Sequence, residues 1–336
     1  MQKINVQIDE IRHINQFRTL PPRYVFNGVE YCIFKNDDAV DNGLIMRSEH
    51  VAPYDVVIRH KFNLGTPAII SDDVRNIMYL TRYTKDRQSL LMKEYLGELS
   101  NYVHLDASTV DLTNSGSPVF DFPINPFVSK AGDERYIIRH NTGARSLGIM
   151  ITPKLMDFNP RMFFRDLAKL RNDKEKQTNA EYQRVCKDYG VTLKLGIETK
   201  KDEAASILSS GSLVITPYNS KPFKEYRVLT SFGGELLVVE RNHDADPKLY
   251  AKVRNEIPTQ LAFNNLSVNL TRLQPHGSFD MWISETDDTW GIFEFQPQYG
   301  HEDIADVVHL PFMQDVIARI CNEFHEQPKK SLEDQT

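Results

Sequence analysis

The segment Ser278–Gly300 is the most informative part of this 336-residue chain, and it reads Ser-Phe-Asp-Met-Trp-Ile-Ser-Glu-Thr-Asp-Asp-Thr-Trp-Gly-Ile-Phe-Glu-Phe-Gln-Pro-Gln-Tyr-Gly. Two short apolar runs flank a polar turn, a pattern that predicts a β-hairpin with the acidic turn Glu285–Asp288 left in water. Asp280 lies on the first predicted strand. Glu294 and Gln296 lie on the second strand and share one of its faces, because alternate side chains of a strand point the same way.

Two carboxylates and an amide oxygen from this hairpin can therefore meet among aromatic residues. Burying them without partners would be costly. Oxygen ligands of this kind suit Mg²⁺, which takes few protein ligands when phosphates supply the rest. The hairpin thus predicts a magnesium site made of Asp280, Glu294 and Gln296. The alternative is an edge hairpin whose acidic side chains face solvent.

Composition limits the classes of function. The chain has 40 Lys and Arg residues against 46 Asp and Glu residues, and the formal net charge of −6 argues against a general nucleic-acid surface. No N-terminal targeting signal and no apolar run of membrane-spanning length are present. The three isolated cysteines predict neither a disulfide framework nor a cysteine zinc site. We therefore expect a reducing, cytoplasmic location, with no nucleic-acid or membrane partner.

The first third of the chain predicts a small α/β domain. Tyr24–Phe34 is a predicted hairpin around Asn27-Gly28, and Val56–Ile58 is a predicted strand. Helices are expected to start at Ser71 and to span Leu90–Leu99. The following segment, residues 110–130, is rich in Ser, Asn, Gly and Pro, which indicates a domain boundary.

A basic, glycine-containing loop follows the predicted strand Tyr136–Ile138 and precedes a second strand at Ile149–Thr152. Gly143 and Gly148 would allow backbone N–H groups to face phosphate oxygens. Arg139 and Arg145 would add positive charge, and a guanidinium group binds phosphate with two donors. The alternative is an ordinary hairpin loop with exposed arginines.

The rest of the chain alternates predicted helices and strands. Helices are predicted from Asn159-Pro160, over Glu181–Tyr189 with an end at Gly190, and over Lys201–Leu208, Lys248–Glu256 and Pro311–Phe324; strands are predicted at Val191–Leu195 and Leu213–Ile215. A further hairpin pairs Lys224–Val228 with Leu236–Arg241. Arg227 and Arg241 on adjacent strands suggest an anionic ligand, although Arg227 and Glu225 could form a cross-strand charge pair.

Taken in chain order, these elements resemble the ATP-grasp superfamily of ATP-dependent carboxylate ligases over about residues 110–324. Tyr136–Gly148 resembles the strand and glycine-rich lid of that superfamily. Leu213–Asn219 resembles the hinge strand that contacts adenine, which implies adenine contacts at Ile215, Thr216 and Tyr218. Glu225–Val228 with Arg241 resembles the hairpin that faces substrate and phosphate. Asp280 and Glu294–Gln296 resemble the metal-binding set.

The resemblance implies an α/β (α+β) ATP-grasp fold, in which two α/β lobes sandwich the nucleotide and an N-terminal α/β domain precedes them. The implied boundaries are an N-terminal domain at 1–110, a small lobe with the lid at 111–215, a large lobe with the metal site at 216–326 and a disordered tail at 327–336. A homodimer is a possible assembly.

The resemblance also implies an ATP-dependent, ADP-forming ligase that joins a carboxylate to an amine, or to a thiol, through an acylphosphate. ATP and Mg²⁺ would be the cofactors, and the substrates would be small-molecule or peptide carboxylates and amines. Arg139, Gly143, Arg145 and Gly148 would bind the phosphates. Arg227 and Arg241 would be catalytic, holding the substrate carboxylate or the transferring phosphoryl group.

This chain departs from the pattern of the superfamily at several positions. Arg139 stands where the superfamily usually has Lys, Gln296 stands where it has Asn, and no acidic residue occupies the hinge at Thr216-Pro217. These departures favour an alternative function, a non-catalytic nucleotide-binding or interaction protein that retains the fold. A plain α/β structural protein with solvated acidic side chains is the third interpretation.

Overall fold

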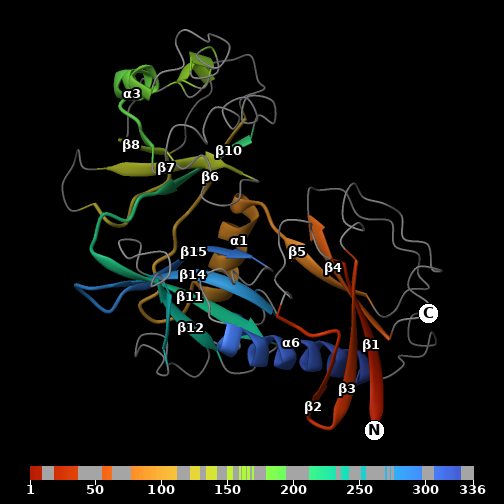
Figure 1. Cartoon of the computed structure of the whole chain (residues 1–336). Coiled ribbons are helices and arrows are strands. Elements are labelled where there is room, and N and C mark those ends of the chain that lie inside the picture. The colour runs from red at the N-terminus through yellow and green to blue at the C-terminus, as the bar shows by residue number, and fades with distance from the viewer. Residues whose placement is uncertain are drawn as a thin grey trace, which may run out of the picture. The chain divides into compact units, whose positions relative to one another are not determined.

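The computed structural model describes residues 1–9, 19–36, 55–62, 77–111, 122–128, 134–141, 150–153, 159, 161–163, 165–166, 169, 179–193, 212–231, 236–241, 251–254, 269–270, 273, 276–296 and 306–326. Within these residues the strands form three five-stranded sheets (Figure 1). The predicted helices at Ser71 and Lys201–Leu208, the predicted tail, and Gly143, Arg145 and Gly148 lie outside the described residues.

The N-terminal sheet has the order β2-β3-β1-β4-β5, and its strands are β1 (Gln2–Asp9), β2 (Arg23–Phe26), β3 (Val29–Asn36), β4 (Val56–Phe62) and β5 (Ile77–Arg82). The strand at Val56 and the hairpin at Asn27-Gly28 are confirmed. Asn27 and Gly28 have φ angles of 47° and 77°, and two-residue hairpin turns of the type I′ class need positive φ at both positions. Strand β1 was missed, although Ile4, Val6 and Ile8 alternate along it and are buried.

A second sheet has the order β6-β10-β7-β8-β9, and its strands are β6 (Ser108–Asp111), β7 (Arg135–His140), β8 (Met150–Pro153), β9 (Thr192–Leu193) and β10 (Ser212–Pro217). Within the described residues, its strand pairings are antiparallel. Helix α3 (Asn179–Asp188) ends one residue before the predicted end at Tyr189, and Gly190, the predicted cap, follows in a turn with a φ of 65°. Helix α1 (Lys85–Leu96) begins earlier than the predicted helix at Leu90.

The third sheet has the order β13-β12-β11-β14-β15, and its strands are β11 (Phe223–Ser231), β12 (Leu237–Arg241), β13 (Ala251–Arg254), β14 (His276–Ser284) and β15 (Trp290–Gln296). Both predicted hairpins are confirmed here. The predicted helix Lys248–Glu256 is wrong, because Ala251–Arg254 pairs with β12 instead. Strand addition satisfies backbone groups that an edge strand would leave unpaired, and this outweighs a weak local helix preference.

One apolar core joins the N-terminal sheet, the third sheet and helix α6 (Asp306–Glu326), the long C-terminal helix of Figure 1. Ile8 and Ile58 come from the N-terminal sheet, and Leu229 and Val239 come from the third sheet. Helix α6 contributes a fully buried stripe that consists of Met313, Val316, Ile317 and Ile320. The spacing of these four residues follows the helical repeat, as the sequence predicted.

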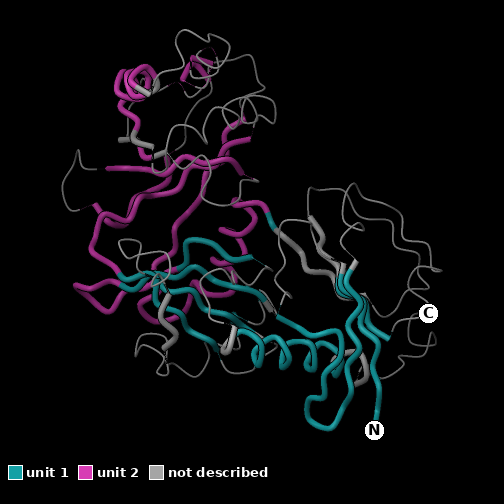
Figure 2. The backbone as a smooth tube through the Cα atoms, viewed as in Figure 1, with its two compact units in different colours: residues 1–83, 224–283, 292–336 teal, residues 84–223, 284–291 magenta. Residues whose placement is uncertain are grey.

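The chain forms two compact units, coloured separately in Figure 2. Unit 1 consists of residues 1–83, 224–283 and 292–336, and unit 2 consists of residues 84–223 and 284–291. The resemblance implies a different division, into an N-terminal domain followed by two lobes that are each continuous in sequence. The domain boundaries that it implies therefore stay predictions. Among the helices that the structure describes, none has both the length and the apolar character needed to span a bilayer.

Candidate functional site

Three neighbouring strands of the third sheet place a charged cluster in unit 1, which we call the Arg–Asp cluster (Glu225, Arg227, Arg241 and Asp280). Glu225 and Arg227 lie two residues apart on β11 and share a face, and the antiparallel register sets Arg241 of β12 directly opposite Glu225. Strand β14, which carries Asp280, lies on the other side of β11. The sheet therefore gathers two arginines and two carboxylates that are distant in sequence.

The contacts within the Arg–Asp cluster are short and specific. Arg227 Nε donates to Asp280 Oδ1 at 2.8 Å, and Arg227 Nη2 donates to Asp280 Oδ2 at 3.2 Å. Arg241 Nη1 donates to Glu225 Oε1 at 2.8 Å and lies 3.4 Å from Asp280 Oδ1. Only 10–18% of each of these four side chains is exposed. Ion pairs this well covered are screened much less by salt than surface pairs.

The cross-strand pair of this hairpin forms between Glu225 and Arg241, while Arg227 pairs with Asp280 from the neighbouring strand. Sequence reasoning identified both arginines and Asp280 as site residues. It did not include Glu225 among them. The pairing of Glu225 with Arg241 depends on the register between β11 and β12, and that register cannot be assigned until the length of the hairpin loop is known.

Two of the three predicted metal ligands lie together on β15. Glu294 and Gln296 are half-buried and two residues apart, so they share a strand face. Asp280, the third predicted ligand, accepts two hydrogen bonds from Arg227 and forms an ion pair with Arg241. Both oxygens of the Asp280 carboxylate are therefore engaged by Arg227. Within the described residues, no group of three or more His, Cys, Asp or Glu side chains forms a metal-binding cluster.

In unit 2, strand β10 carries the predicted adenine contacts. On one side β10 pairs with β6 only as far as Ile215, which lies opposite Ser108. On its other side it pairs with β7 through Thr216 and Pro217, while Arg139 of β7 lies opposite Val214. Strand pairing on the β6 side thus stops, within the described residues, where the predicted hinge begins. Ser212 and Tyr218 both bond to the β7 side of the sheet, so the alternation of an antiparallel ladder points the backbone groups of Thr216 toward β7 as well, where Thr216 lies opposite Ile137.

Tyr218, the last predicted adenine contact, has partners within the protein for its backbone groups and for its ring. Its backbone N–H donates to Arg135 O at 3.0 Å, and its carbonyl accepts from Asn125 Nδ2 at 3.3 Å. The Arg135 guanidinium lies over the Tyr218 ring, 4.6 Å from its centroid. Any contribution of Tyr218 to a nucleotide site would therefore come from its ring. Its backbone groups have partners.

The ionisable groups of β7 are also affected by burial. Desolvation lowers the pKa of His140, so this side chain is neutral near pH 7. Burial, together with the negative charge and hydrogen bond of Glu134, raises the pKa of Tyr136 to about 12. Neither His140 nor Tyr136 therefore carries a charge at neutral pH. Arg139 is the cationic side chain near the C-terminal end of β7.

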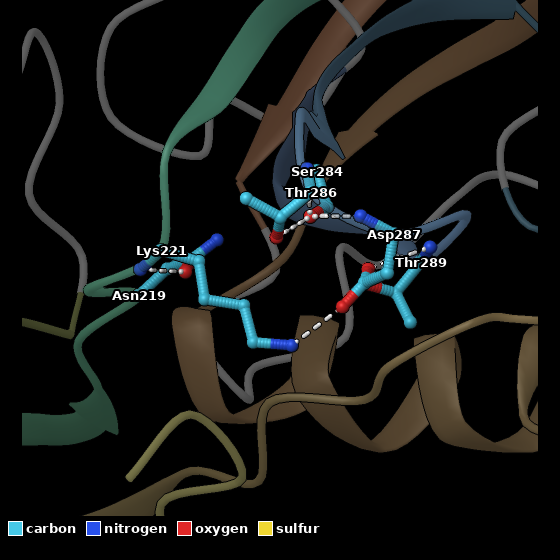
Figure 3. Close-up of polar contacts among 6 residues, drawn as sticks. All are labelled: Asn219, Lys221, Ser284, Thr286, Asp287 and Thr289. Atoms are coloured by element: carbon cyan, nitrogen blue, oxygen red, sulfur yellow. Dashed lines mark hydrogen bonds and ion pairs between the residues drawn. The ribbon is translucent and has the colours of Figure 1, made fainter. Parts of the chain in front are cut away.

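The turn of the β14–β15 hairpin belongs to unit 2, where the connection after β10 contacts it (Figure 3). Lys221 Nζ donates to Asp287 Oδ2 at 2.7 Å, and Glu285 N donates to Pro222 O at 3.0 Å. The Lys221 contact, followed by hydrogen bonds from Thr289, holds the pKa of Asp287 well below its usual range. The sequence predicted a solvated acidic turn, and it missed these contacts because they join residues far apart in the sequence, 66 positions apart for Lys221 and Asp287.

Trp290 fixes the same turn to residues after α1. Its backbone N–H donates to Asn101 O at 3.0 Å, its carbonyl accepts from Val103 N at 2.8 Å, and its indole Nε1 donates to Ser100 O at 3.0 Å. Its ring packs against Tyr102 with the centroids 4.9 Å apart. The hairpin that carries Asp280 and Glu294 on its strands therefore has its turn bonded at two places within unit 2.

Comparisons with known proteins agree on the architecture. No protein-family model and no curated protein sequence matches the chain. Among solved structures, the D-alanine–D-alanine ligase from Bacillus anthracis shares 12% identity, with 97% of this chain and 99% of that chain covered and a TM-score of 0.50. The same enzyme complexed with ATP gives 12% identity, the same coverage and a TM-score of 0.51. With its mixed α/β sheets in this order, the chain has the ATP-grasp fold.

Proposed function

We propose that this protein is an ATP-dependent, ADP-forming ligase that joins a carboxylate to an amine, or to a thiol, through an acylphosphate. The observation that carries the proposal is the Arg–Asp cluster, which sets two guanidinium groups and a carboxylate of the predicted metal set side by side on three strands. The fold of D-alanine–D-alanine ligases supports the same reaction class. The substrates would be small-molecule or peptide carboxylates and amines, and the location cytoplasmic.

In this proposal, one set of residues binds the adenine base and another binds the phosphates and Mg²⁺. Ile215, Thr216 and Tyr218 would contact adenine, and the end of the pairing between β6 and β10 at Ile215 supports this assignment. Arg139, Gly143, Arg145 and Gly148 would bind the phosphates. Asp280, Glu294 and Gln296 would hold Mg²⁺, whose chemical contribution is to neutralise phosphate charge.

The proposed chemistry has two steps. An oxygen of the substrate carboxylate attacks the γ-phosphorus, and the bond to ADP breaks to give the acylphosphate. The amine nitrogen then attacks the acyl carbon, phosphate leaves, and the nitrogen loses a proton. Arg227 and Arg241 would hold the substrate carboxylate and the transferring phosphoryl group in line, so that positioning and charge stabilisation supply most of the rate.

Calorimetric titration with ATP, with and without Mg²⁺, tests the proposal. The native protein should bind ATP in a metal-dependent manner, and Glu294→Ala should lose that dependence. Glu285→Ala is the matched control, because Glu285 is an exposed glutamate in the turn of the same hairpin. Metal-dependent binding would justify a substrate screen that follows ADP release. The absence of any nucleotide binding to the folded native protein would contradict the proposal.

A second candidate function is a nucleotide-binding protein that retains the fold without catalysis. Arg139 and Gln296 favour it, because both differ in shape from the Lys and Asn of the resembling superfamily, and Gln is one methylene longer than Asn. This candidate predicts MgATP binding with no ADP release in the presence of any carboxylate and amine pair. The screen described above therefore separates the two functions.

A further inference from the structure

The side chain of Asn125 joins the ends of two strands of the second sheet. Its Nδ2 donates to Arg135 O, at the start of β7, at 2.8 Å and to Tyr218 O, directly after β10, at 3.3 Å. Its Oδ1 accepts from Phe127 N at 2.9 Å, which fixes the orientation of the amide. Because Tyr218 N also donates to Arg135 O at 3.0 Å, both backbone groups of Tyr218 are held in place.

The ring of Tyr218 is held from one side by a cation. The Arg135 guanidinium lies over the ring, 4.6 Å from its centroid, and the negative potential of an aromatic face attracts a cation at this distance. Arg135 is exposed and Tyr218 is half-buried, so a ligand can reach the pair from solvent. The guanidinium covers one face of the ring, which leaves the opposite face as the one on which a flat ligand can stack.

We propose that Arg135 and Asn125 are positioning residues for the nucleotide base, because they fix Tyr218 in the orientation in which its ring stacks on that base. This inference rests on the proposed function, which makes Tyr218 an adenine contact. Asn125 fixes the backbone and Arg135 fixes the ring, so neither has to be ordered when the nucleotide binds, and pre-ordered groups cost less affinity. The phosphates do not use this ring. Loss of either residue should therefore weaken binding of the base and leave binding of the phosphates unchanged.

The magnesium complexes of ATP and of tripolyphosphate test the part played by Arg135, because only ATP carries a base. Arg135→Gln should weaken MgATP binding by about two- to fivefold in calorimetry, the range that corresponds to the loss of an exposed cation–π contact. Its affinity for magnesium tripolyphosphate should equal that of the native protein. Arg135→Lys should restore MgATP affinity, because an ammonium group is also attracted to the face of the ring. Arg184→Gln is the matched control, since Arg184 is an exposed arginine of the same unit that pairs with Glu181, and it should leave both affinities unchanged.

Asn125→Asp tests the amide in the same two titrations. The carboxylate keeps an acceptor for Phe127 N, but it places an oxygen where Nδ2 now donates to two carbonyl oxygens. MgATP affinity should fall by about fivefold, within the range of a lost hydrogen bond, while the affinity for magnesium tripolyphosphate is again unchanged. Asn159→Asp is the matched control, since Asn159 Oδ1 likewise accepts a backbone N–H, that of Met162. It should leave both affinities unchanged.

A general loosening of unit 2 would lower the affinities for MgATP and for magnesium tripolyphosphate together, and that result overturns the inference. An Arg135→Lys variant that binds MgATP as weakly as Arg135→Gln also overturns it, as does full MgATP affinity in the Gln and Asp variants. Failure of the proposed function has a different signature. The predicted pattern of affinities without ADP release for any carboxylate and amine pair contradicts the ligase and leaves the positioning role standing. A native protein that binds no MgATP contradicts both.

Discussion

Arg227 is a buried cation that pairs with the largely covered carboxylate of Asp280, so its removal should reduce stability as well as the proposed activity. Arg227→Ala should lower the free energy of unfolding by about 3 kcal/mol, because breaking this covered ion pair removes the closer of the two guanidinium groups that compensate the Asp280 carboxylate. Urea denaturation followed by circular dichroism measures this.

Lys93→Ala provides the comparison for that measurement. Lys93 pairs with Asp106 at 2.9 Å, but the two side chains are 60% and 53% exposed. Lys93→Ala should therefore lower the free energy of unfolding by less than about 1 kcal/mol. Equal losses in the Arg227 and Lys93 variants would show that the Arg–Asp cluster is as well solvated as an ordinary surface pair.

Asp166 gives a pH-dependent prediction in unit 2. The hydroxyl of Tyr189 donates to Asp166 Oδ2 at 2.6 Å and is the main reason that the pKa of Asp166 lies below its usual range. A carboxylate with a lowered folded-state pKa stabilises the fold above the unfolded pKa of about 3.9, and this contribution is lost as pH falls through the lower folded value.

Tyr189→Phe should therefore cost about 1 kcal/mol of unfolding free energy at pH 7 and progressively less as the carboxyl becomes protonated. Urea unfolding of the native protein and the variant at pH 7 and at pH 3 measures the difference. A cost that is the same at both pH values would mean that the Tyr189 hydroxyl stabilises the protonated and the ionised carboxyl of Asp166 equally, and would contradict the prediction.

The β2–β3 hairpin has the clearest backbone requirement among the elements. Gly28 has a φ of 77°, and a Cβ added there would meet no atom within 4 Å. Gly28→Ala should thus cost about 1–2 kcal/mol through backbone conformation alone. Gly28→Asn should cost less, because Asn tolerates the left-handed region. Thermal unfolding of both variants tests this, and an alanine variant as stable as the native protein would contradict it.

Elements whose signal is local could be predicted from the sequence, and elements that depend on a partner strand could not. The hairpins at Asn27-Gly28 and Ser278–Gly300 follow from turn residues between apolar runs. In contrast, Ala251–Arg254 has no strong local preference, and its pairing with β12 decides that it is a strand. The pairing of Arg227 with Asp280 could not be predicted either, because it depends on the strand order β12-β11-β14, which is set by the tertiary structure.

At the scale of the whole molecule, α6 contributes an essential part of the apolar core that it shares with the N-terminal sheet and the third sheet. Its residues Met313, Val316, Ile317 and Ile320 are fully buried against both sheets of unit 1. A chain that ends at residue 305 should therefore lose cooperative unfolding and bind a hydrophobic dye. A chain that ends at residue 326 is the control and should behave like the full-length protein. Cooperative unfolding of the shorter chain would refute this account of the core.

The assembly of the units explains why domain boundaries are difficult to read from this sequence. Unit 1 takes three separate segments of the chain, and the turn of a hairpin in its sheet belongs to unit 2. Compositional boundaries, such as the Ser-, Gly- and Pro-rich residues 110–130, mark local breaks in the chain. They carry no information about which distant segments pack together.

The burial of the three thiols has a practical consequence for spectroscopy. Cys32, Cys186 and Cys321 are all buried, and desolvation raises the pKa of Cys186 to about 11 and that of Cys321 to about 12. The thiolate is the form that reacts with maleimides, so these two side chains are poor nucleophiles at neutral pH. A cysteine introduced at an exposed position such as Asp288 could then be labelled selectively with a fluorophore, without replacing the native cysteines.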